Sequence, residues 1–441
     1  MSACGLIIHV LVVIWCLTRH SGPWMGSPVS ETEVTTAPRP LLLPDGRPAA
    51  RAWSLDPALL HLNHGSFGAV PLVAQERQNL LREEMDRSPV VWFPALPQRV
   101  ANTRVDIAAF LRVAPGDLAL VPNASAGVST VYAALDPRPG GEIVVTDHGY
   151  GAVTMGAERL ARRWGGRVRT ARVPLAADEE QAYEAVVAEL SDATGLIVLD
   201  HITSATARRM PVDRVGAEAQ RRGIPLLVDG AHAPGLIAAP LSGVTCDFWV
   251  GNLHKWPCAP RGTAALVARG PLRAGLHPLI DSWSAADPYP DRFDQQGTLD
   301  TTGYLATPTA LGFIEHTWGW DTARRYMDDL AGYAEQVVGA AFAELTGVSG
   351  AVDVGMPVPG MRLVRLPAGL AATRVEADAL RDRVAGELGV ETAFTSFGGV
   401  GYLRLSAHVY NTAADYEYFA ESCVPVLGEW AASARGHHSG S

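Results

Sequence analysis

Hydrophobic and polar residues follow two different rhythms along this chain. From about residue 70 to residue 300, short runs that are apolar at nearly every position alternate with stretches in which apolar residues recur with helical spacing. Continuous apolar runs are typical of strands buried on both faces of a parallel sheet, and the helical stretches are typical of the layers that cover it. The predicted strands lie within Leu118–Asn123, Gly141–Gly151, Gly195–Thr203, Ile224–Gly235 and Cys246–Lys255, with helices such as Gln181–Ser191 and Val212–Arg222 between them. This alternation predicts a three-layer α/β/α domain with a mostly parallel sheet.

The pattern changes after about Thr307, where helical periodicity dominates and only a few strands are expected. The predicted helices are Thr309–Thr317, Thr322–Leu345, Val375–Leu388 and Ala413–Glu429, and the predicted strands are Gly360–Leu366 and Gly401–Ser406. We therefore expect a large domain over residues 51–306 and a smaller α+β domain over residues 307–441. Residues 51–70 are expected to contribute to the entrance of the site or to the smaller domain.

The first 50 residues differ in composition from the rest and are expected to form a disordered leader. An apolar run, Leu6–Leu17, is interrupted by His9 and is too short to span a bilayer. No Lys or Arg precedes it, so it is a weak match to a signal peptide. Residues Ser21–Pro48 are rich in Pro, Ser, Thr and Gly, and Met25 is an alternative start. We expect a cytoplasmic protein.

Charge and cysteine content narrow the classes of partner. The 441 residues are 48% hydrophobic and 19% charged and carry a formal net charge of −10. An acidic surface disfavours nucleic acid and anionic membranes as partners. The five cysteines are odd in number and match neither a zinc site nor a disulfide framework, so no metal is expected. Cys258 could be catalytic or simply a small buried apolar residue.

Polar residues gather where the predicted strands end. In a parallel α/β sheet, ligands bind at the carboxyl ends of the strands. The residues at those positions are Asn123, Asp147, His148, Asp200, His201, Asp229, His232, His254 and Lys255. Five strand ends with this chemistry indicate a binding site rather than ordinary surface turns.

Lys255 and Asp229 suggest what the site binds. Lys255 follows an apolar strand in "GNLHKW", and burial favours the neutral amine, which can attack an aldehyde cofactor. Asp229 ends an apolar strand in "LLVDGAH" and needs a partner, for which a protonated pyridine nitrogen is suitable. A helix N-cap is the alternative for Asp229. Gly230 and Ala231 beside it would let a flat ligand approach.

The segment Val121–Thr130, "VPNASAGVST", joins a predicted strand to a predicted helix. Its small residues leave main-chain N–H groups free at the start of a helix, where phosphate binds readily. An ordinary capped helix is the alternative.

In order, Asn-Ala-Ser, His-x-Tyr-Gly-Ala, Asp-Gly-Ala-His-Ala-Pro-Gly and His-Lys-Trp resemble the class V aminotransferase-like enzymes, which depend on pyridoxal 5′-phosphate. The closest branch resembles the isopenicillin N epimerase-like proteins, and the similarity covers roughly residues 55 to 430. Three further segments support that branch: "LNHGSFGAVP" (Leu62–Pro71), "GTLDTTGYLATP" (Gly297–Pro308) and "YLRLSAHVYNTAADY" (Tyr402–Tyr416). The resemblance implies the fold of PLP-dependent fold type I enzymes. Pro257, Cys258, Arg208 and Arg209 depart from the branch and weaken any transfer of its substrate.

The resemblance also implies roles around the cofactor. Lys255 would bind the cofactor covalently and later move the α-proton, and Asp229 would pair with the pyridine nitrogen. The remaining cofactor contacts would be His232 near the ring hydroxyl, Tyr150 stacked on the ring with His148 as a less favoured substitute, and Ala124, Ser125 and His254 at the phosphate. Thr298 would reach the phosphate of a neighbouring subunit, which implies a homodimer.

On the substrate side, Arg404 would bind the carboxylate of an amino acid through its planar guanidinium, and Asn63 and His64 would line the pocket. We expect a lyase that eliminates a sulfur or halogen leaving group from an amino-acid side chain in a specialised pathway, such as antibiotic or secondary-metabolite biosynthesis. Amino-acid epimerisation is the second reading and transamination the third, since positioning decides among them.

Two other activities are disfavoured. A non-catalytic sensor built on the same fold would not need an intact Lys255, Asp229 and Arg404. A cysteine desulfurase needs a mobile cysteine in the smaller domain, and Cys423, the one candidate there, lies in a predicted helix.

Overall fold

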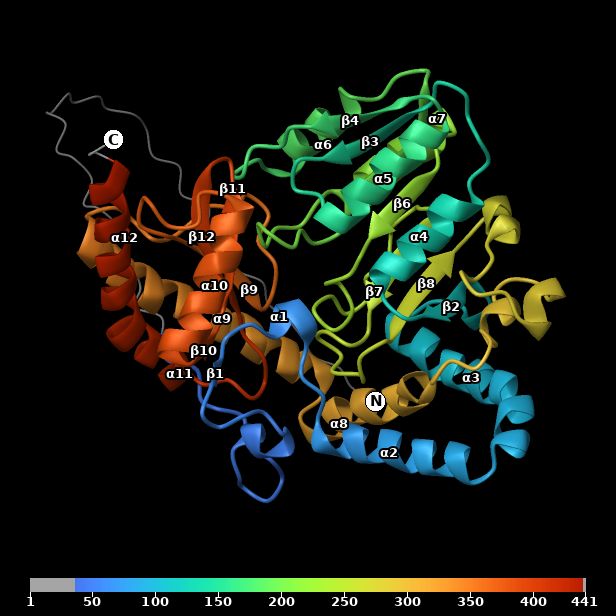
Figure 1. Ribbon diagram of the computed structural model, residues 1–441, viewed down its shortest axis with the longest axis horizontal. Coiled ribbons are helices and arrows are strands. Elements are labelled where there is room, and N and C mark those ends of the chain that lie inside the picture. Colours follow the sequence, from blue (N-terminus) through green and yellow to red (C-terminus); the bar gives the residue numbers. More distant parts are fainter. Residues whose placement is uncertain (1–35, 439–441) are drawn as a thin grey trace, which may run out of the picture. The chain divides into compact units, whose positions relative to one another are not determined.

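A seven-stranded sheet is the central element of the computed structural model, which describes residues 36–438 (Figure 1). The strand order is β2-β8-β7-β6-β5-β3-β4, and β8 alone runs antiparallel to its neighbours β7 and β2. The strands are β2 (Leu118–Val121), β3 (Glu142–Thr146), β4 (Arg167–Ala171), β5 (Thr194–Asp200), β6 (Leu226–Asp229), β7 (Phe248–Asn252) and β8 (Ala264–Ala268). The mostly parallel sheet confirms the predicted fold class.

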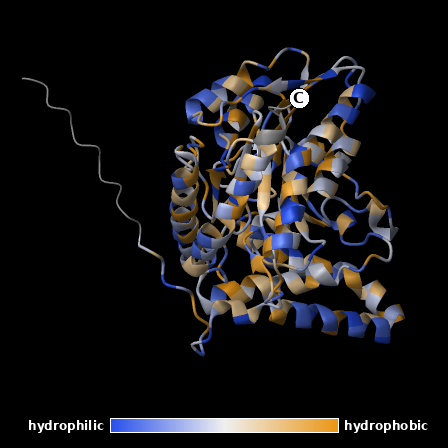
Figure 2. Cartoon of the chain, turned by 60° about the vertical axis from the view of Figure 1, so that its left-hand side comes forward, coloured by the Kyte–Doolittle hydropathy of each residue, from blue (hydrophilic) through white to orange (hydrophobic). Residues whose placement is uncertain are grey.

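Both faces of this sheet are covered, which explains the continuous apolar runs. In β5, Leu196 and Val198 point into the core shared with α4 and α5, whereas Ile197 and Leu199 point into the core on the opposite face. The helices of the first face are α4 (Ala124–Ala134) and α5 (Gly151–Arg163), and those of the second are α3 (Pro89–Leu111), α6 (Glu179–Val187) and α7 (Val212–Arg222). The helices carry both hydrophilic and hydrophobic residues (Figure 2), as expected for one buried side each.

A three-stranded antiparallel sheet forms the centre of the C-terminal part. Its order is β11-β12-β9, with β9 (Met361–Arg365), β11 (Ala393–Phe397) and β12 (Val400–Ser406). The accompanying helices are α8 (Thr302–Thr317), α9 (Trp320–Thr346), α10 (Arg374–Leu388), α11 (Ala413–Tyr418) and α12 (Val424–His438). The single helix predicted over Ala413–Glu429 is interrupted by a π-helical turn, Phe419–Cys423.

A segment near the N-terminus pairs with this C-terminal part. The strand β1 (Leu60–His61) is parallel to β10 (Val390–Glu391), and Asn63 forms an isolated bridge with Ser406. The helices α1 (His64–Phe67) and α2 (Leu72–Arg87) follow, and α2 packs on α8. Residues 60–63 therefore lie beside β12. The predicted domain boundary between residues 306 and 307 stays a prediction.

The predicted disordered leader was too long at its C-terminal end. Leu42 bridges Pro48, Leu43 and Ala49 are buried, and the indole N–H of Trp318 donates to the carbonyl of Leu42 over 2.7 Å. The Pro- and Gly-rich composition of residues 41–50 therefore encodes a packed turn rather than disorder. It leads into the 3-10 turn η1 (Ala49–Ala52).

The other predictions on the leader, Leu6–Leu17 and Met25, lie outside the described residues. Within residues 36–438, no helix has the length and apolar character needed to cross a membrane. The remaining short 3-10 segments are η2 (Pro115–Asp117), η3 (Pro271–Gly275), η4 (Trp283–Ala286) and η5 (Asp291–Phe293).

Candidate active site

The carboxyl ends of β5, β6 and β7 bring polar side chains onto one face of the sheet. Asp200 ends β5, Asp229 ends β6 and Asn252 ends β7. All three are buried, and Asp200 and Asp229 are direct partners in the strand register. Lys255 follows three residues after β7. The structure thus brings together the strand ends that the sequence singled out.

Lys255 is buried and its amine lies 3.0 Å from Nε2 of His232. The indole N–H of Trp256 donates to Nδ1 of the same ring over 3.4 Å. A neutral imidazole that accepts at Nδ1 carries its hydrogen on Nε2, so His232 donates to Lys255. Only an uncharged amine can accept that hydrogen bond. The geometry therefore favours a nucleophilic, neutral Lys255.

The electrostatics of the site favour the same form of Lys255. Burial, reinforced by the positive charge of Arg404, lowers the pKa of Lys255 from 10.5 to about 7, although Asp229 opposes the shift. Burial also lowers the pKa of His232 well below its usual value, which keeps the ring neutral. Lys255 is, moreover, the only lysine in the sequence, a signal that was available from the sequence and was not used.

Asp229 is a buried carboxyl in need of a partner. Its Oδ1 accepts from the main-chain N–H of Ala231 over 3.0 Å, and burial raises its pKa. The residues directly after Asp229 form turns and not a helix, so the alternative that Asp229 is a helix N-cap is wrong. A protonated pyridine nitrogen would supply the missing positive donor. The site therefore fits the predicted cofactor at this end.

The structure gives a reason for Gly230 that does not depend on a ligand, and the predicted close approach of a flat ligand stays a prediction. A Cβ at Gly230 would lie 2.3 Å from the ring of Trp249, and a Cβ at Gly251 would lie 2.2 Å from the same ring. Both glycines are required because the buried indole packs against their main chain.

Arg404 is a buried cation without a carboxylate partner among the described residues. Its Nη1 donates to the carbonyl of Ser204 over 2.7 Å, and its Nη2 donates to Oδ1 of Asn63 over 3.1 Å and to Oγ of Ser66 over 3.0 Å. Its Nε has no acceptor in the described part of the chain, and burial lowers its pKa to about 10. Neutral groups thus orient the guanidinium while its charge stays unpaired, as suits a site for an anionic substrate group.

Ser204 and Ser66 were not predicted as site residues. Ser204 follows β5 in "HITS" and Ser66 lies in "NHGSFG", so both stand within segments that already carried predicted residues.

The two predicted substrate-side residues Asn63 and His64 differ in their surroundings. Asn63 contacts Arg404 directly, as described above. The ring of His64 is buried, with Nε2 3.0 Å from the carbonyl oxygen of Lys255 and Nδ1 3.0 Å from the hydroxyl of Tyr410. His64 therefore helps to hold the main chain at Lys255 in position through this contact. Its predicted role in lining the pocket stays a prediction.

Tyr150 and His148 occupy unlike positions. Tyr150 precedes α5, is partly exposed, and lies close enough for its hydroxyl to interact electrostatically with Arg404. His148 is buried, with Nε2 2.8 Å from the carbonyl of Val173 and its ring stacked on Phe397 at 4.2 Å. These contacts occupy the His148 ring, which favours Tyr150 over His148 for stacking on a cofactor.

At the start of α4, two main-chain N–H groups are already bonded to side chains. Asn123 caps the helix by accepting from the N–H of Ala126 over 2.8 Å, and Asn252 accepts from the N–H of Ala124 over 2.8 Å. Ser125 is exposed between them. Asn252 was not predicted as a site residue, because an amide that ends an apolar strand gives no distinctive signal.

The two remaining predicted phosphate ligands lie apart in the chain. Nδ1 of His254 is 3.0 Å from the carbonyl of Thr263, and burial lowers the pKa of this ring to about 4. Thr298 is exposed in the loop before α8. The predicted roles of these residues at the phosphate stay predictions.

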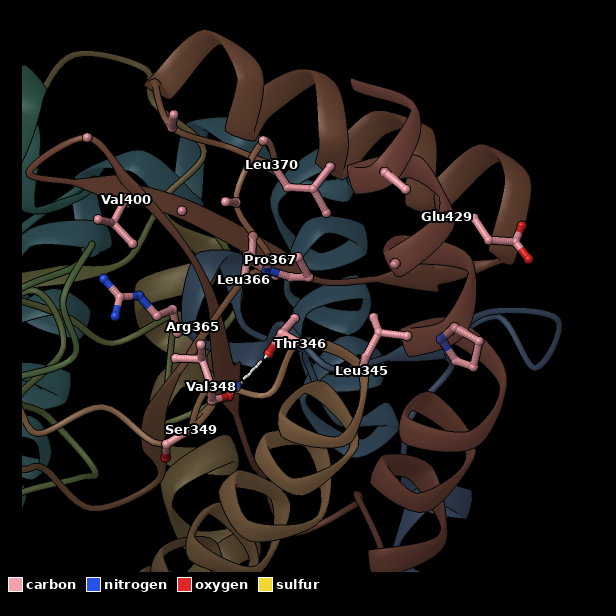
Figure 3. Close-up of a pocket in the computed structure, with 18 residues that line it drawn as sticks. Leu345, Thr346, Val348, Ser349, Arg365, Leu366, Pro367, Leu370, Val400 and Glu429 are labelled. Carbon is pink, nitrogen blue, oxygen red and sulfur yellow. Dashed lines mark hydrogen bonds between the residues drawn. The ribbon is translucent and has the colours of Figure 1, made fainter. Parts of the chain in front are cut away.

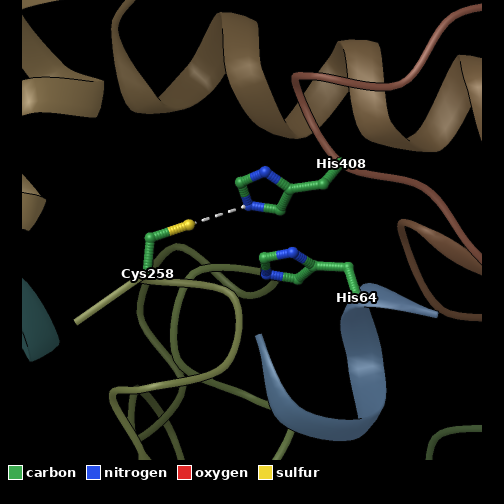
Figure 4. A group of neighbouring side chains, drawn as sticks. All are labelled: His64, Cys258 and His408. Carbon is green, nitrogen blue, oxygen red and sulfur yellow. Dashed lines mark hydrogen bonds between the residues drawn. The ribbon is translucent and has the colours of Figure 1, made fainter. Parts of the chain in front are cut away.

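His64, Cys258 and His408 form a buried cluster (Figure 4), and His64 also contacts the carbonyl oxygen of Lys255. Their possible ligand atoms lie within 4.8 Å of one another, but the two imidazoles stack face to face at 3.8 Å with planes 18° apart. Lone pairs in nearly parallel rings point in parallel directions and do not converge on one ion. Nε2 of His408 also contacts the carbonyl of Trp256 at 3.2 Å. The cluster is therefore packed as an aromatic core rather than as a metal centre.

A hollow of about 830 Å³ lies elsewhere, in the C-terminal part (Figure 3). Its lining includes Leu345, Arg365, Leu370, Val400 and Glu429. None of the strand-end residues lines it, so it is separate from the candidate active site.

The parallel sheet, the buried lysine at its carboxyl edge and the facing aspartate define an enzyme of the PLP-dependent type. The family model for class-V aminotransferases matches residues 95–419, and the chain belongs to this family. Family membership and the fit of the site confirm pyridoxal 5′-phosphate as the cofactor.

Individual relatives differ in their named activities. The chain is 31% identical over 404 residues to isopenicillin N epimerase of Streptomyces clavuligerus, covering 85% of this chain and 96% of that protein. The epimerase of Amycolatopsis lactamdurans is 30% identical over 404 residues, covering 85% and 98%. A probable chloroplastic L-cysteine desulfhydrase of Arabidopsis thaliana is 26% identical over 398 residues, covering 82% and 81%.

Among solved structures, a C-DES variant with glycine covalently linked to its PLP cofactor has a TM-score of 0.72. It is 20% identical, and the match covers 86% of this chain and 99% of that chain. This similarity confirms the fold.

Proposed function

We propose that this protein is a lyase that acts at the α-carbon of an amino acid and eliminates a sulfur or halogen leaving group from its side chain. The observation that carries the proposal is the buried amine of Lys255, 3.0 Å from Nε2 of His232, in a protein whose Arg404 is also buried and has no carboxylate partner among the described residues. An amine that is neutral near pH 7 can both attack an aldehyde and accept a proton from carbon.

Each charged residue of the site has a separate task in this proposal. Lys255 holds the cofactor and then takes the proton from the α-carbon. Asp229 keeps its negative charge opposite the pyridine nitrogen, and Arg404 binds the substrate carboxylate with its planar guanidinium. The bound cofactor supplies an electron sink for negative charge at the α-carbon. Tyr150 covers the ring, and Ser125 with His254 contributes to the phosphate site.

The cysteines support release of a leaving group rather than its capture by the enzyme. Cys246, Cys258 and Cys423 are buried, and burial raises the pKa of Cys246 to about 12 and that of Cys423 to about 11. A buried thiol with a raised pKa is a poor sulfur acceptor. Within the described residues, persulfide transfer to a cysteine is therefore disfavoured. The named activity of the desulfhydrase relative agrees with a carbon–sulfur bond as the target.

Epimerisation at a substrate α-carbon is the second candidate. It is favoured by the identity of 30–31% with the two isopenicillin N epimerases over most of both chains. That reaction needs a proton delivered to the face opposite the one deprotonated. We assign that delivery to Tyr150, which in this proposal covers the ring and whose hydroxyl acts electrostatically on Arg404.

We also propose a homodimer. Several large apolar side chains before the sheet and in the loop preceding α8 are exposed, among them Phe67, Val90, Val91 and Trp283, the last with 93% exposure. Exposed apolar side chains of this size are a common feature of interfaces. Thr298 is exposed in the same loop region, where a neighbouring subunit's phosphate could be reached.

Proton NMR in deuterated water with a panel of amino acids, including cysteine, cystine and β-halogenated alanines, tests the reaction. We expect release of a keto acid with ammonia and sulfide or halide, and none of it from Lys255→Ala. Exchange and inversion at the α-carbon with an unchanged carbon skeleton would establish the epimerase instead. Light scattering of the same sample tests the dimer.

A further inference from the structure

Asp200 is a second buried carboxyl beside Asp229, and the proposed function gives it no task. Asp200 ends β5, Asp229 ends β6, and the two are register partners in adjacent parallel strands. Both side chains are almost fully buried, with 4% and 3% of their surface exposed. Two acidic residues are thus paired in the interior of the protein, where isolated charges are costly.

Alternation along the strands places both carboxyls on the same face. Val198 in β5 and Leu227 in β6 belong to the core shared with α4 and α5. Asp200 and Asp229 lie two residues further along their strands and therefore point the same way. Neighbouring strands lie about 4.8 Å apart, so the two carboxyls are close neighbours.

The groups that face this pair provide no cation to separate them. The main-chain N–H of Tyr150 favours the charged form of Asp200 and lowers its pKa, and Asp229 accepts a hydrogen bond from the N–H of Ala231. The phenol of Tyr132 on α4 is near both carboxyls and donates its hydrogen to the carbonyl of Val153. Lys255 acts electrostatically on Asp229, and Arg404 acts on Lys255. Among the described residues, no side chain donates a hydrogen bond to either carboxyl.

We propose that Asp200 is a positioning residue that shares one proton with Asp229, and that this proton resides on Asp200 when the cofactor is bound. The proposal rests on the pairing of Asp229 with the pyridine nitrogen in the proposed function. Protonation of Asp200 leaves Asp229 with its full negative charge. The carbonyl oxygen of the protonated Asp200 still accepts from Tyr150 and so fixes the turn that carries the stacking ring.

Physical chemistry supports this division between the two carboxyls. Two carboxylates in contact cannot both ionise without strong repulsion, so one of them takes up a proton. Burial raises the pKa of both groups, and the negative charge of Asp229 raises that of Asp200 further. Gly149 stands in the same turn, where an added Cβ would lie 3.8 Å from Oδ2 of Asp200, so the turn is packed directly on this carboxyl.

The matched variants Asp200→Asn and Asp200→Ala separate the charge of Asp200 from its hydrogen bond. Asn is neutral and keeps an oxygen acceptor for the N–H of Tyr150, whereas Ala removes that acceptor. In fluorescence titrations of the apoprotein with pyridoxal 5′-phosphate, we expect Asp200→Asn to bind within about threefold of the wild type. We expect Asp200→Ala to bind roughly tenfold more weakly. Equal losses in both variants would show that a charge on Asp200 is needed and would overturn the proposal.

Infrared spectroscopy of the apoprotein detects the shared proton without the cofactor. We expect the carbonyl band of a protonated, buried carboxyl near neutral pH. In both Asp200→Asn and Asp229→Asn, this band should titrate away at a pH lower by about one unit or more, because the remaining carboxyl has lost its charged neighbour. A band with the same midpoint in Asp200→Asn as in the wild type would refute sharing. Tyr132→Phe is the control and should leave the midpoint in place.

The two assays distinguish failure of this inference from failure of the proposed function. If Asp229→Asn binds the cofactor as tightly as the wild type, the pairing with the pyridine nitrogen is wrong. That outcome overturns the part of the inference that assigns the proton to Asp200 when the cofactor is bound. The infrared midpoints still decide independently whether the two carboxyls share a proton.

Discussion

Replacing the buried lysine by a neutral residue of similar length should stabilise the apoprotein, and by an amount that depends on pH. In the folded protein, the pKa of Lys255 falls from 10.5 to about 7. A depressed lysine pKa means that the unfolded chain binds more protons than the folded chain between these two values. The resulting penalty on folding is fully present below pH 7, shrinks as the pH rises and disappears above 10.5.

The shift sets the expected magnitude. One pKa unit corresponds to about 1.4 kcal/mol, so the penalty at pH 7 amounts to roughly 5 kcal/mol. The Lys255→Met apoprotein should therefore exceed the wild type in unfolding free energy most at pH 6 to 7. The difference should fall by about 1.4 kcal/mol per pH unit above that range. Loss of the hydrogen bond from His232 offsets this gain by a constant of about 1 kcal/mol.

Urea unfolding of both apoproteins from pH 6 to pH 10 measures this difference. The other titrating groups are common to the two proteins, and among them Asp229 and His232 also respond to the charge of Lys255. A difference that does not change with pH would refute a depressed lysine pKa. Because Lys255 is the only lysine, carbon-13 labelling at the lysine ε-methylene provides an independent NMR titration of a single residue. Its midpoint should lie near 7 in the folded apoprotein and near 10.5 in urea.

Three further substitutions test the packing and polarity of the site. Trp256→Phe removes the N–H that fixes the tautomer of His232. The pKa of Lys255 in the NMR titration should then rise by less than about one unit. An unchanged pKa contradicts the tautomer assignment. Gly230→Ala forces a Cβ to within 2.3 Å of the Trp249 ring and should cost about 1–3 kcal/mol in urea unfolding. Gly386→Ala, in open space on a helix, should cost nothing, and equal losses would be inconsistent with the clash. Arg404→Lys loses the planar fork, so the KM for the amino acid should rise about tenfold or more; an unaltered KM argues against carboxylate binding there.

The sheet was predictable because nearly all of its strands are apolar on both faces. The apolar runs indicated β2, β3, β5, β6 and β7, although each observed strand is shorter than the run that predicted it. In contrast, β4 and β8 were missed. The first lies at the edge of the sheet, where its sequence "RVRTA" is largely accessible to solvent, and the second has the short sequence "AALVA", which is buried throughout. Periodicity detects a strand only where burial imposes it.

The residues that hold Arg404 show a second limit. Lys255 and Asp229 could be predicted because a charged residue at the end of an apolar strand is chemically unusual. Ser66 and Ser204 are ordinary surface residues by type, and they come from segments 138 positions apart that meet only in the folded chain. The pairing of β1 with β10 brings the first of these segments to the smaller sheet. Such long-range pairing leaves no local pattern to recognise.

The charges of Lys255, Arg404, Asp229 and Asp200 influence one another. Arg404 carries a buried positive charge without a carboxylate partner, and that charge helps to keep Lys255 neutral. A substrate carboxylate at Arg404 would cancel this effect and raise the pKa of the nearby amine, so that it accepts a proton more readily after substrate binds. Substrate binding would therefore change the basicity of the one lysine, and through it the charge that Asp229 faces.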